Sequence, residues 1–169
     1  THCISSAASD VYKRQLLEYT DPSHLHLVYL AVKALQKLMD YSSAVPLLRD
    51  LGGVELLSQR LELEVHHILK LTGENNSDMV VGESLDINGD QLLSRKRLIK
   101  VLLKSLGSST YTPGNANRSQ SSQESTLPAT LSLIYRNADK FGGDIYYSAV
   151  TVMSDLIHKD PTSLTSLFE

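Results

Sequence analysis

One stretch, residues 31–72, constrains the fold of this chain most: two amphipathic helical patterns are separated by a short Pro-containing segment and a Gly-Gly pair. The first helix is predicted from Asp21-Pro22 to about Ser42, with apolar residues at i, i+3/4 and i+7. These residues are Val28, Ala31, Val32, Leu35, Leu38 and Met39. The second helix, which ends at Gly73, repeats the stripe with Val54, Leu57, Leu61, Val65 and Ile68. Neither helix can bury its stripe alone, so each must pack on neighbours.

The turn between these helices identifies the kind of packing. A short helix is predicted over residues 44–50, with Pro46 in its first turn, and Gly52 supplies the left-handed residue that ends it. Short helix, glycine turn and long helix are typical of armadillo-like and HEAT-like repeats, and a helix–Gly-Gly–helix pattern appears again around Gly142-Gly143. We therefore predict an all-α fold, an armadillo/HEAT-like α-solenoid fragment.

Size and composition restrict the class of protein further. The chain has 169 residues, which is enough for one domain or a few stacked repeats. Its net charge of −3 gives no global attraction to nucleic acid or anionic membrane. No apolar run approaches the roughly 18 residues of a membrane span. Cys3 is the only cysteine, so no intrachain disulfide can form, as suits a reducing compartment. We expect a cytoplasmic and/or nuclear protein without membrane contact.

The chain divides into segments of different composition. Residues 1–15 look like translated linker and are set aside as a non-native leader; 16–73 are helical repeats; 74–90 are an acidic loop. An amphipathic helix over 91–106 and a Ser-rich flexible linker over 107–126 follow. A last helical repeat, 127–169, is truncated, because Asp160-Pro161 opens a new helix just before Glu169. We interpret the chain as an internal fragment.

The 91–106 helix carries the one candidate binding surface. Its basic residues, Lys96, Arg97, Lys100 and Lys104, share one face that could contact an acidic partner or nucleic acid. The alternative, which we prefer, is a solvated face balanced by the five acids of 74–90. Arg95 projects among the apolar positions instead; we expect its stem to be packed and its head to lie in water.

In the last repeat, Leu127, Leu131, Ile134, Ala138 and Phe141 keep one helical register up to Gly142. Asp144 is expected to cap the final helix, whose stripe of Ile145, Ala149, Val152 and Leu156 is widened by Tyr146, Val150, Met153 and Ile157.

Motifs for metal or catalysis fail on their spacing. His66 and His67 point about 100° apart on a helix, and Glu62 with His66 is better interpreted as a surface pair. Residues 86–90, DINGD, open like a calcium loop, but Gln91 and Arg97 stand where glycine and a bidentate glutamate are needed. No nucleophile elbow or phosphate-binding loop occurs. We therefore predict no catalytic, cofactor-binding or metal-binding residue.

Three blocks carry a family resemblance: LQKLMDYSSAVPLLRDLGGVELLSQRLELEVHHIL, RKRLIKVLLKSLGSSTYTP and LPATLSLIYRNADKFGGDIYYSAVTVMSDLIHKDPTSL. They resemble the N-terminal armadillo-like region of giant, plant-type HECT E3 ubiquitin-protein ligases. The resemblance implies a parent enzyme that transfers ubiquitin through a cysteine of a C-terminal HECT domain, no part of which is present here. No catalytic residue can be carried over to this chain.

The resemblance implies a non-catalytic scaffold that acts in protein ubiquitination and binds substrates or regulators of the ligase. A ubiquitin-charged E2 would be engaged only through the HECT domain. The alternative is a stand-alone helical-repeat adaptor that binds a protein or nucleic acid, of which we favour protein. Sequence beyond Glu169 would separate the two, since further repeats and a HECT domain support the first.

Overall fold

The computed structural model describes residues 21–50, 52–74, 84–110 and 127–159, and the elements formed by these residues are all helices. They are η1 (Pro22–His24, a 3-10 helix), α2 (Leu25–Leu38), α3 (Ala44–Asp50), α4 (Gly53–Glu74), α5 (Ser84–Thr110), α6 (Leu127–Arg136), α7 (Ala138–Phe141) and α8 (Gly143–Lys159). The predicted leader (1–15), the centres of both predicted loops and the helix expected at Asp160-Pro161 lie outside the described residues.

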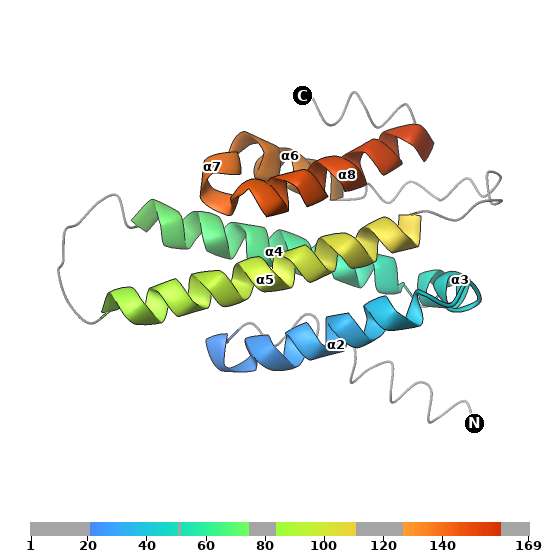
Figure 1. Ribbon diagram of the computed structural model, residues 1–169, viewed down its shortest axis with the longest axis horizontal. Coiled ribbons are helices and arrows are strands. Elements are labelled where there is room, and N and C mark those ends of the chain that lie inside the picture. Colours follow the sequence, from blue (N-terminus) through green and yellow to red (C-terminus); the bar gives the residue numbers. More distant parts are fainter. Residues whose placement is uncertain (1–20, 51, 75–83, 111–126, 160–169) are drawn as a thin grey trace.

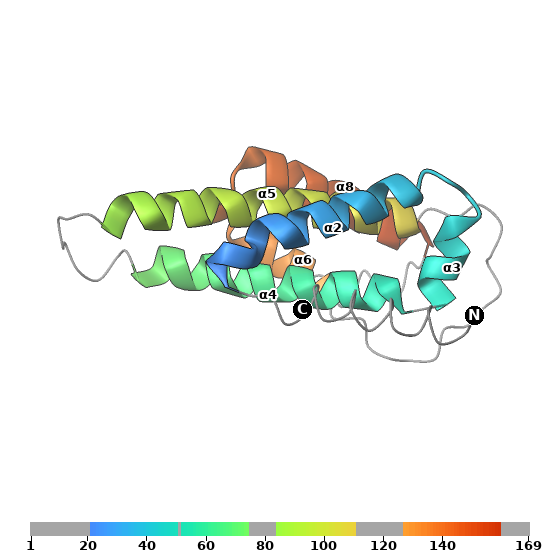
Figure 2. The same cartoon turned by 90° about the horizontal axis from the view of Figure 1, so that it is seen from below.

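The long helices form two layers (Figures 1 and 2). α2, α5 and α8 lie side by side in one layer, and α4 and α6 lie in the other. The chain alternates between the layers, and the short helices α3 and α7 lie in the crossings that precede α4 and α8. This alternation of packed helix pairs is the architecture of an α-solenoid, so the predicted all-α, solenoid-like fold is confirmed.

The core lies between the layers, with α5 at its centre. α5 contacts α2, α4 and α8, and its apolar face is fully buried among them. The buried core residues of these helices and of the α2 C-cap are Leu25, Val28, Val32, Met39, Leu56, Leu57, Leu61, Val65, Ile68, Leu98, Ile99, Val101, Leu102, Leu103, Leu106, Ile145, Ala149 and Val152. The helical stripes predicted from the sequence therefore supply most of the core.

The first long helix is shorter than predicted. It ends at Leu38 rather than near Ser42, because the next amides bond to carbonyls three residues back: Asp40 N–H to Lys37 O at 3.2 Å and Tyr41 N–H to Leu38 O at 3.1 Å. Such 3-10-type bonds close the last turn of a helix. The prediction that Leu38 belongs to the buried stripe is wrong, since its side chain is 54% exposed.

The glycine turn after α3 is as predicted. Gly52 has a φ of +76°, and its N–H donates to Arg49 O at 3.0 Å. Gly53 opens α4 and is required for a different reason: a β-carbon there would lie 2.7 Å from Leu48 Cγ. α3 and α4 can therefore meet at this angle only because one residue permits the turn and the next permits the close approach.

The helix α5 is longer than predicted at both ends. It begins at Ser84 rather than at residue 91. It continues past Gly107 to Thr110. Gly107 therefore does not end the helix; it faces α8, where a β-carbon would be at an ordinary contact distance of 3.7 Å from Val152 Cγ2.

The predicted continuous helix over 127–141 is broken at Asn137. The Asn137 backbone leaves the helical region (φ −119°, ψ 37°), and its side-chain Nδ2 donates to Leu133 O at 2.9 Å. An asparagine side chain that bonds to the backbone of the preceding turn competes with helix continuation, which explains the break between α6 and α7. Two smaller predictions also fail: Asp144 lies in the first turn of α8, which begins at Gly143, and Val150 is exposed.

Candidate functional site

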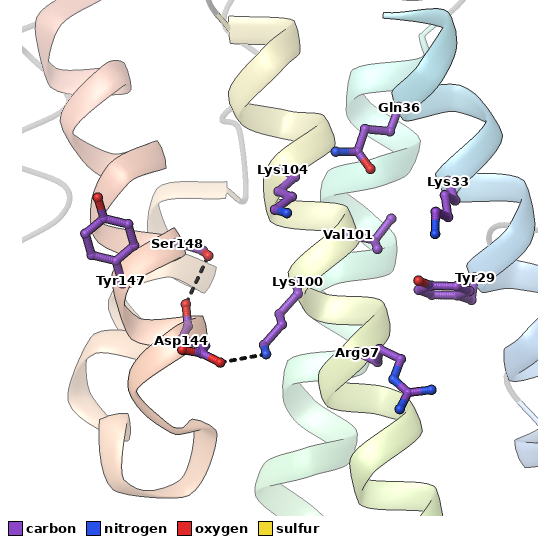
Figure 3. A pocket seen from close by; sticks show the side chains of 10 residues that line it. All are labelled: Tyr29, Lys33, Gln36, Arg97, Lys100, Val101, Lys104, Asp144, Tyr147 and Ser148. Carbon is purple, nitrogen blue, oxygen red and sulfur yellow. Dashed lines mark hydrogen bonds and ion pairs between the residues drawn. The ribbon is translucent and has the colours of Figure 1, made fainter.

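The basic face predicted on α5 lines a groove on the α2–α5–α8 layer. Arg97, Lys100 and Lys104 follow i, i+3, i+7 spacing and so share one side of the helix. Arg97 and Lys104 are exposed and Lys100 is half-buried. With α2 on one side and α8 on the other, they form the floor of a hollow of about 470 Å³ (Figure 3).

Each neighbouring helix supplies a wall of this hollow. Tyr29, Lys33 and Gln36 come from α2. Asp144, Tyr147 and Ser148 come from α8. A second hollow of about 430 Å³ adjoins the first, shares Arg97, Lys100 and Asp144 with it, and adds Lys96 and the α7–α8 turn. We refer to the two hollows together as the α5 groove. All four residues of the predicted basic face thus line one continuous depression.

The charge of the α5 groove is opposite to that of the chain. The chain carries a net charge of −3. The groove is lined by the cations Lys33, Lys96, Arg97, Lys100 and Lys104 and by the carboxylate of Asp144. Among the described residues, one of these cations forms an ion pair: Lys100 Nζ lies 2.9 Å from Asp144 Oδ2. The groove is therefore a strongly positive patch on an acidic protein.

The Lys100–Asp144 pair connects the floor of the groove to its α8 wall (Figure 3). The hydrogen bond from Lys100, reinforced by the charge of its ammonium group, lowers the pKa of Asp144. Both side chains face water, with exposed fractions of 42% for Lys100 and 85% for Asp144. An exposed pair of this kind adds little to stability, so it can rearrange at low cost.

The α2 wall combines a cation with an aromatic ring. Lys33 Nζ lies 5.6 Å from the centroid of the Tyr29 ring, within the range of a cation–π contact. On the opposite wall, the Tyr147 side chain is 74% exposed. The groove thus offers two aromatic side chains in addition to its positive charge.

The opposite side of α5 carries a feature that the sequence interpretation missed. Arg95 is only 1% exposed, and its Nη1 donates to Glu64 Oε2 of α4 at 2.7 Å. The other oxygen of Glu64 accepts from Arg60 Nη2 at 2.6 Å. The side-chain amide of Gln91 also contacts Arg95. With its oxygen turned toward the guanidinium group, it accepts hydrogen bonds from Arg95 Nε and Nη2 at 3.2 and 3.1 Å. The expectation that the Arg95 head lies in water is wrong.

Burial shapes the electrostatics of this Arg60–Glu64–Arg95 cluster. Desolvation lowers the pKa of Arg60, partly offset by the charge and hydrogen bond of Glu64. The cluster had a signal in the sequence: Arg60 and Glu64 stand at i, i+4 beside the apolar stripe of α4, and Arg95 interrupts the apolar stripe of α5. Opposite charges placed beside two facing stripes indicate a buried pair, because the stripes themselves must meet.

Comparison with known proteins identifies the family. A family model described as Domain of Unknown Function (DUF913) matches residues 30–169, which is most of the chain.

The chain belongs to the DUF913 family.

Relatives of this DUF913 chain are named as ubiquitin ligases. It is 44% identical over 164 residues to "E3 ubiquitin-protein ligase UPL1" of Arabidopsis thaliana and 44% identical over 162 residues to "E3 ubiquitin-protein ligase UPL2" of the same plant, covering 90% of this chain in both. It is 25% identical over 149 residues, or 86% of the chain, to "E3 ubiquitin-protein ligase ptr1" of Schizosaccharomyces pombe. In all three the match spans 4% of the relative's length. No solved structure matches the chain. The resemblance stated from the sequence blocks is confirmed.

Two histidines of the DUF913 chain, His66 and His67, lie on α4. His66 Nε2 is 3.9 Å from Glu62 Oε1 on the exposed side of α4, as predicted for a surface pair. Burial, and then the charge of Arg95, lower the pKa of His67, which lies near the buried cluster. Within the described ranges, no three His, Cys, Asp or Glu side chains are grouped so that they could hold a metal ion. Residues 86–90 are part of α5, so their backbone does not form a calcium loop.

Among the described residues, no helix is both long enough and apolar enough to cross a bilayer.

Proposed function

We propose that this chain is a non-catalytic scaffold segment of a HECT-type E3 ubiquitin-protein ligase and acts in protein ubiquitination by binding substrates or regulators of the ligase. The identity of 44% to two relatives named as E3 ubiquitin-protein ligases supports the connection to ubiquitination. The match covers only 4% of either relative, which is consistent with one segment of a much longer enzyme.

The observation that carries the scaffold role is an apolar stripe on the outer side of α2. Leu27, Leu30 and Leu38 are 51%, 48% and 54% exposed, although α2 buries its other side against α5. Helical repeats bury such faces against the next repeat along the array. The two-layer stack thus has the surface expected of a unit that continues into a larger solenoid.

The position of the only cysteine supports the absence of catalysis. Ubiquitin transfer through a thioester needs a thiolate activated by its surroundings. The single cysteine of the chain, Cys3, precedes residues 30–169, which match the family. The family region therefore contains no thiol that could accept ubiquitin.

A thioester assay tests the non-catalytic part of this proposal. The chain is incubated with E1, E2, ubiquitin and ATP and examined on a non-reducing gel, beside a Cys3→Ser variant. We expect no thiol-sensitive ubiquitin adduct on either protein. An adduct on the wild-type chain that the variant lacks would contradict a scaffold role.

A chimera tests the role in the ligase. In UPL1, the segment that matches this chain is either deleted or replaced by this chain. We expect both proteins to accept ubiquitin from an E2, and we expect deletion to reduce ubiquitination of at least one UPL1 substrate while the replacement restores it. Unchanged ubiquitination of every substrate after deletion would count against the proposal.

A further inference from the structure

We propose that the α5 groove binds an extended acidic segment of a partner protein, whose carboxylates pair with Arg97, Lys100 and Lys104. This inference deepens the proposed scaffold function and rests on it only for the role of the partner in ubiquitination. The binding itself is a property of the chain and is measured without a ligase.

The spacing of the cations fits an extended peptide. Arg97 and Lys104 are seven residues apart on one side of α5, which places them about 10 Å apart along the helix axis. An extended segment rises about 3.3 Å per residue and presents every second side chain on one side, so carboxylates two and four residues apart, at about 7 and 13 Å, bracket this distance. Lys100 lies between the two cations, within reach of an acidic residue at an intermediate position.

The cations are available to such a segment. Among the described residues, Lys96, Arg97 and Lys104 form no ion pair with a carboxylate, and Lys100 pairs only with the exposed Asp144. Long basic side chains on three neighbouring turns repel one another, and a partner that brings carboxylates relieves this repulsion. The arrangement costs the free chain a little stability, and that cost decreases when an acidic segment binds.

The walls offer contacts for the rest of a peptide. Tyr147 on α8 and the Tyr29–Lys33 pair on α2 flank the floor. Gln36 extends from α2 toward α5 and can both donate and accept hydrogen bonds with a peptide backbone (Figure 3). Tyrosine and arginine are enriched among the residues that contribute most to the affinity of protein interfaces.

The position of Asp144 favours a peptide over a nucleic acid. Asp144 lies on the rim of both hollows and is exposed to an incoming ligand. A nucleic acid strand carries a phosphate at every nucleotide and would bring one of them close to this carboxylate. A peptide can place a neutral residue there and its acids elsewhere. The overall charge of −3 also opposes binding to a polyanion without a defined geometry.

The test is a titration of the full 169-residue chain against labelled probes, followed by fluorescence anisotropy. The first probe is a fluorescein-labelled peptide of alternating serine and glutamate, about twelve residues long. The second replaces every glutamate with glutamine, and the third is a single-stranded oligonucleotide of similar length. We expect the glutamate peptide to bind at least about tenfold more tightly than the other two. Its affinity should fall as salt is raised from about 50 to about 200 mM.

Charge-reversal variants locate the site. Arg97→Glu with Lys104→Glu should weaken binding of the glutamate peptide by about tenfold or more, because two attractions become repulsions. The matched control is Lys37→Glu with Lys70→Glu, which changes the net charge equally at exposed positions outside the groove. The control should bind within about twofold of wild type. Circular dichroism of both variants checks that the helices are intact.

A third variant acts in the opposite direction. Asp144→Asn removes the carboxylate of the rim and frees Lys100, so it should tighten peptide binding by about two- to fivefold. If the groove had only a structural role, this substitution would not increase the affinity for the peptide. The proposal is overturned if the glutamate and glutamine peptides bind alike, if the two charge-reversal variants lose equal affinity, or if the oligonucleotide binds most tightly at the groove. None of these results would alter the thioester and chimera experiments, so the two proposals fail separately.

Discussion

Two arginines on α5, Arg95 and Arg97, show how one helix uses the same side chain for two purposes. Arg95 is buried and bonded to Glu64 of α4. Arg97 is exposed on the floor of the α5 groove, with no carboxylate partner among the described residues. They are two positions apart, which on a helix is a rotation of about 200°. One arginine therefore faces the other layer while the other faces solvent.

Burial, rather than residue type, determines whether a charge pairs strongly with fixed partners or weakly with exchangeable ones. In the interior, each charge has lost its water and depends on its ion-pair and hydrogen-bond partners, so Glu64 holds α4 and α5 in one arrangement. On the surface, water already stabilises each cation, so pairing is weak and exchangeable. The interior cluster thus fixes the position of the helix whose outer side forms the floor of the α5 groove.

The largest effect is expected from breaking the interior cluster. Glu64→Gln leaves Arg60 and Arg95 without their shared carboxylate, and removing one member of a buried ion pair costs about 3–5 kcal/mol. This is a large part of the total stability of a small domain. Urea unfolding followed by circular dichroism should show a much lower midpoint or a chain that is already partly unfolded.

The matched control is Glu62→Gln, on the same helix but at an exposed position. Its free energy of unfolding should stay within about 0.5 kcal/mol of wild type. Equal losses in the two variants would show that the Arg60–Glu64–Arg95 cluster has no special role in the interior.

Replacing the whole cluster sharpens the comparison. In Arg60→Met/Glu64→Leu/Arg95→Met, no charge of the cluster remains to be desolvated, and apolar side chains of similar size fill its volume. Such replacements of buried ion pairs are often neutral or stabilising. We expect the triple variant to unfold within about 1 kcal/mol of wild type or above it. A loss as large as that of Glu64→Gln would show that the cluster stabilises the fold by more than avoiding an unpaired charge.

A smaller effect is expected in the pH dependence. Because burial and the charge of Arg95 lower the pKa of His67 below its ordinary 6.5, the unfolded chain binds more protons than the folded chain just below that pH. The free energy of unfolding therefore falls as pH decreases through this range, until the folded His67 is itself protonated. His67→Gln should reduce this slope between about pH 7 and pH 5.

The exposed neighbour provides the control for the pH experiment. His66 is 59% exposed and pairs only loosely with Glu62, so His66→Gln should change the slope less than His67→Gln does. If His67→Gln leaves the slope at its wild-type value, the influence of the buried cluster does not reach this residue.

Helical patterns predicted most of the fold because solenoid helices bury continuous stripes. The short helix over 44–50, the left-handed Gly52 and the break at Gly142 follow from local chemistry and were predictable. The ends of α2 and α5 were not, since α2 ends where turn hydrogen bonds close it and α5 continues through Gly107 instead of ending there. The break at Asn137 depends on a side-chain bond that periodicity does not detect.

The candidate site was predictable only in part. The four basic residues of α5 could be found from their spacing, but the walls come from α2 and α8, which are distant in sequence. Arg95 was misplaced because a single helix cannot show that Glu64 lies opposite it on α4. The apolar stripe of one helix indicates which of its residues are buried. The partner of a buried residue depends on how that stripe packs against the stripe of another helix. Whether the basic face binds a partner stays a prediction.

One variant tests most directly the central claim that the charges of α5 are divided between an interior and a binding surface. In Arg97→Gln, we expect the free energy of unfolding to stay within about 0.5 kcal/mol of wild type, while the affinity for the glutamate peptide falls by about threefold or more. Both quantities are measured on the same preparation, by urea unfolding and by anisotropy titration. A loss of stability with unchanged peptide affinity would contradict the account, because Arg97 would then serve the fold, as Arg95 does.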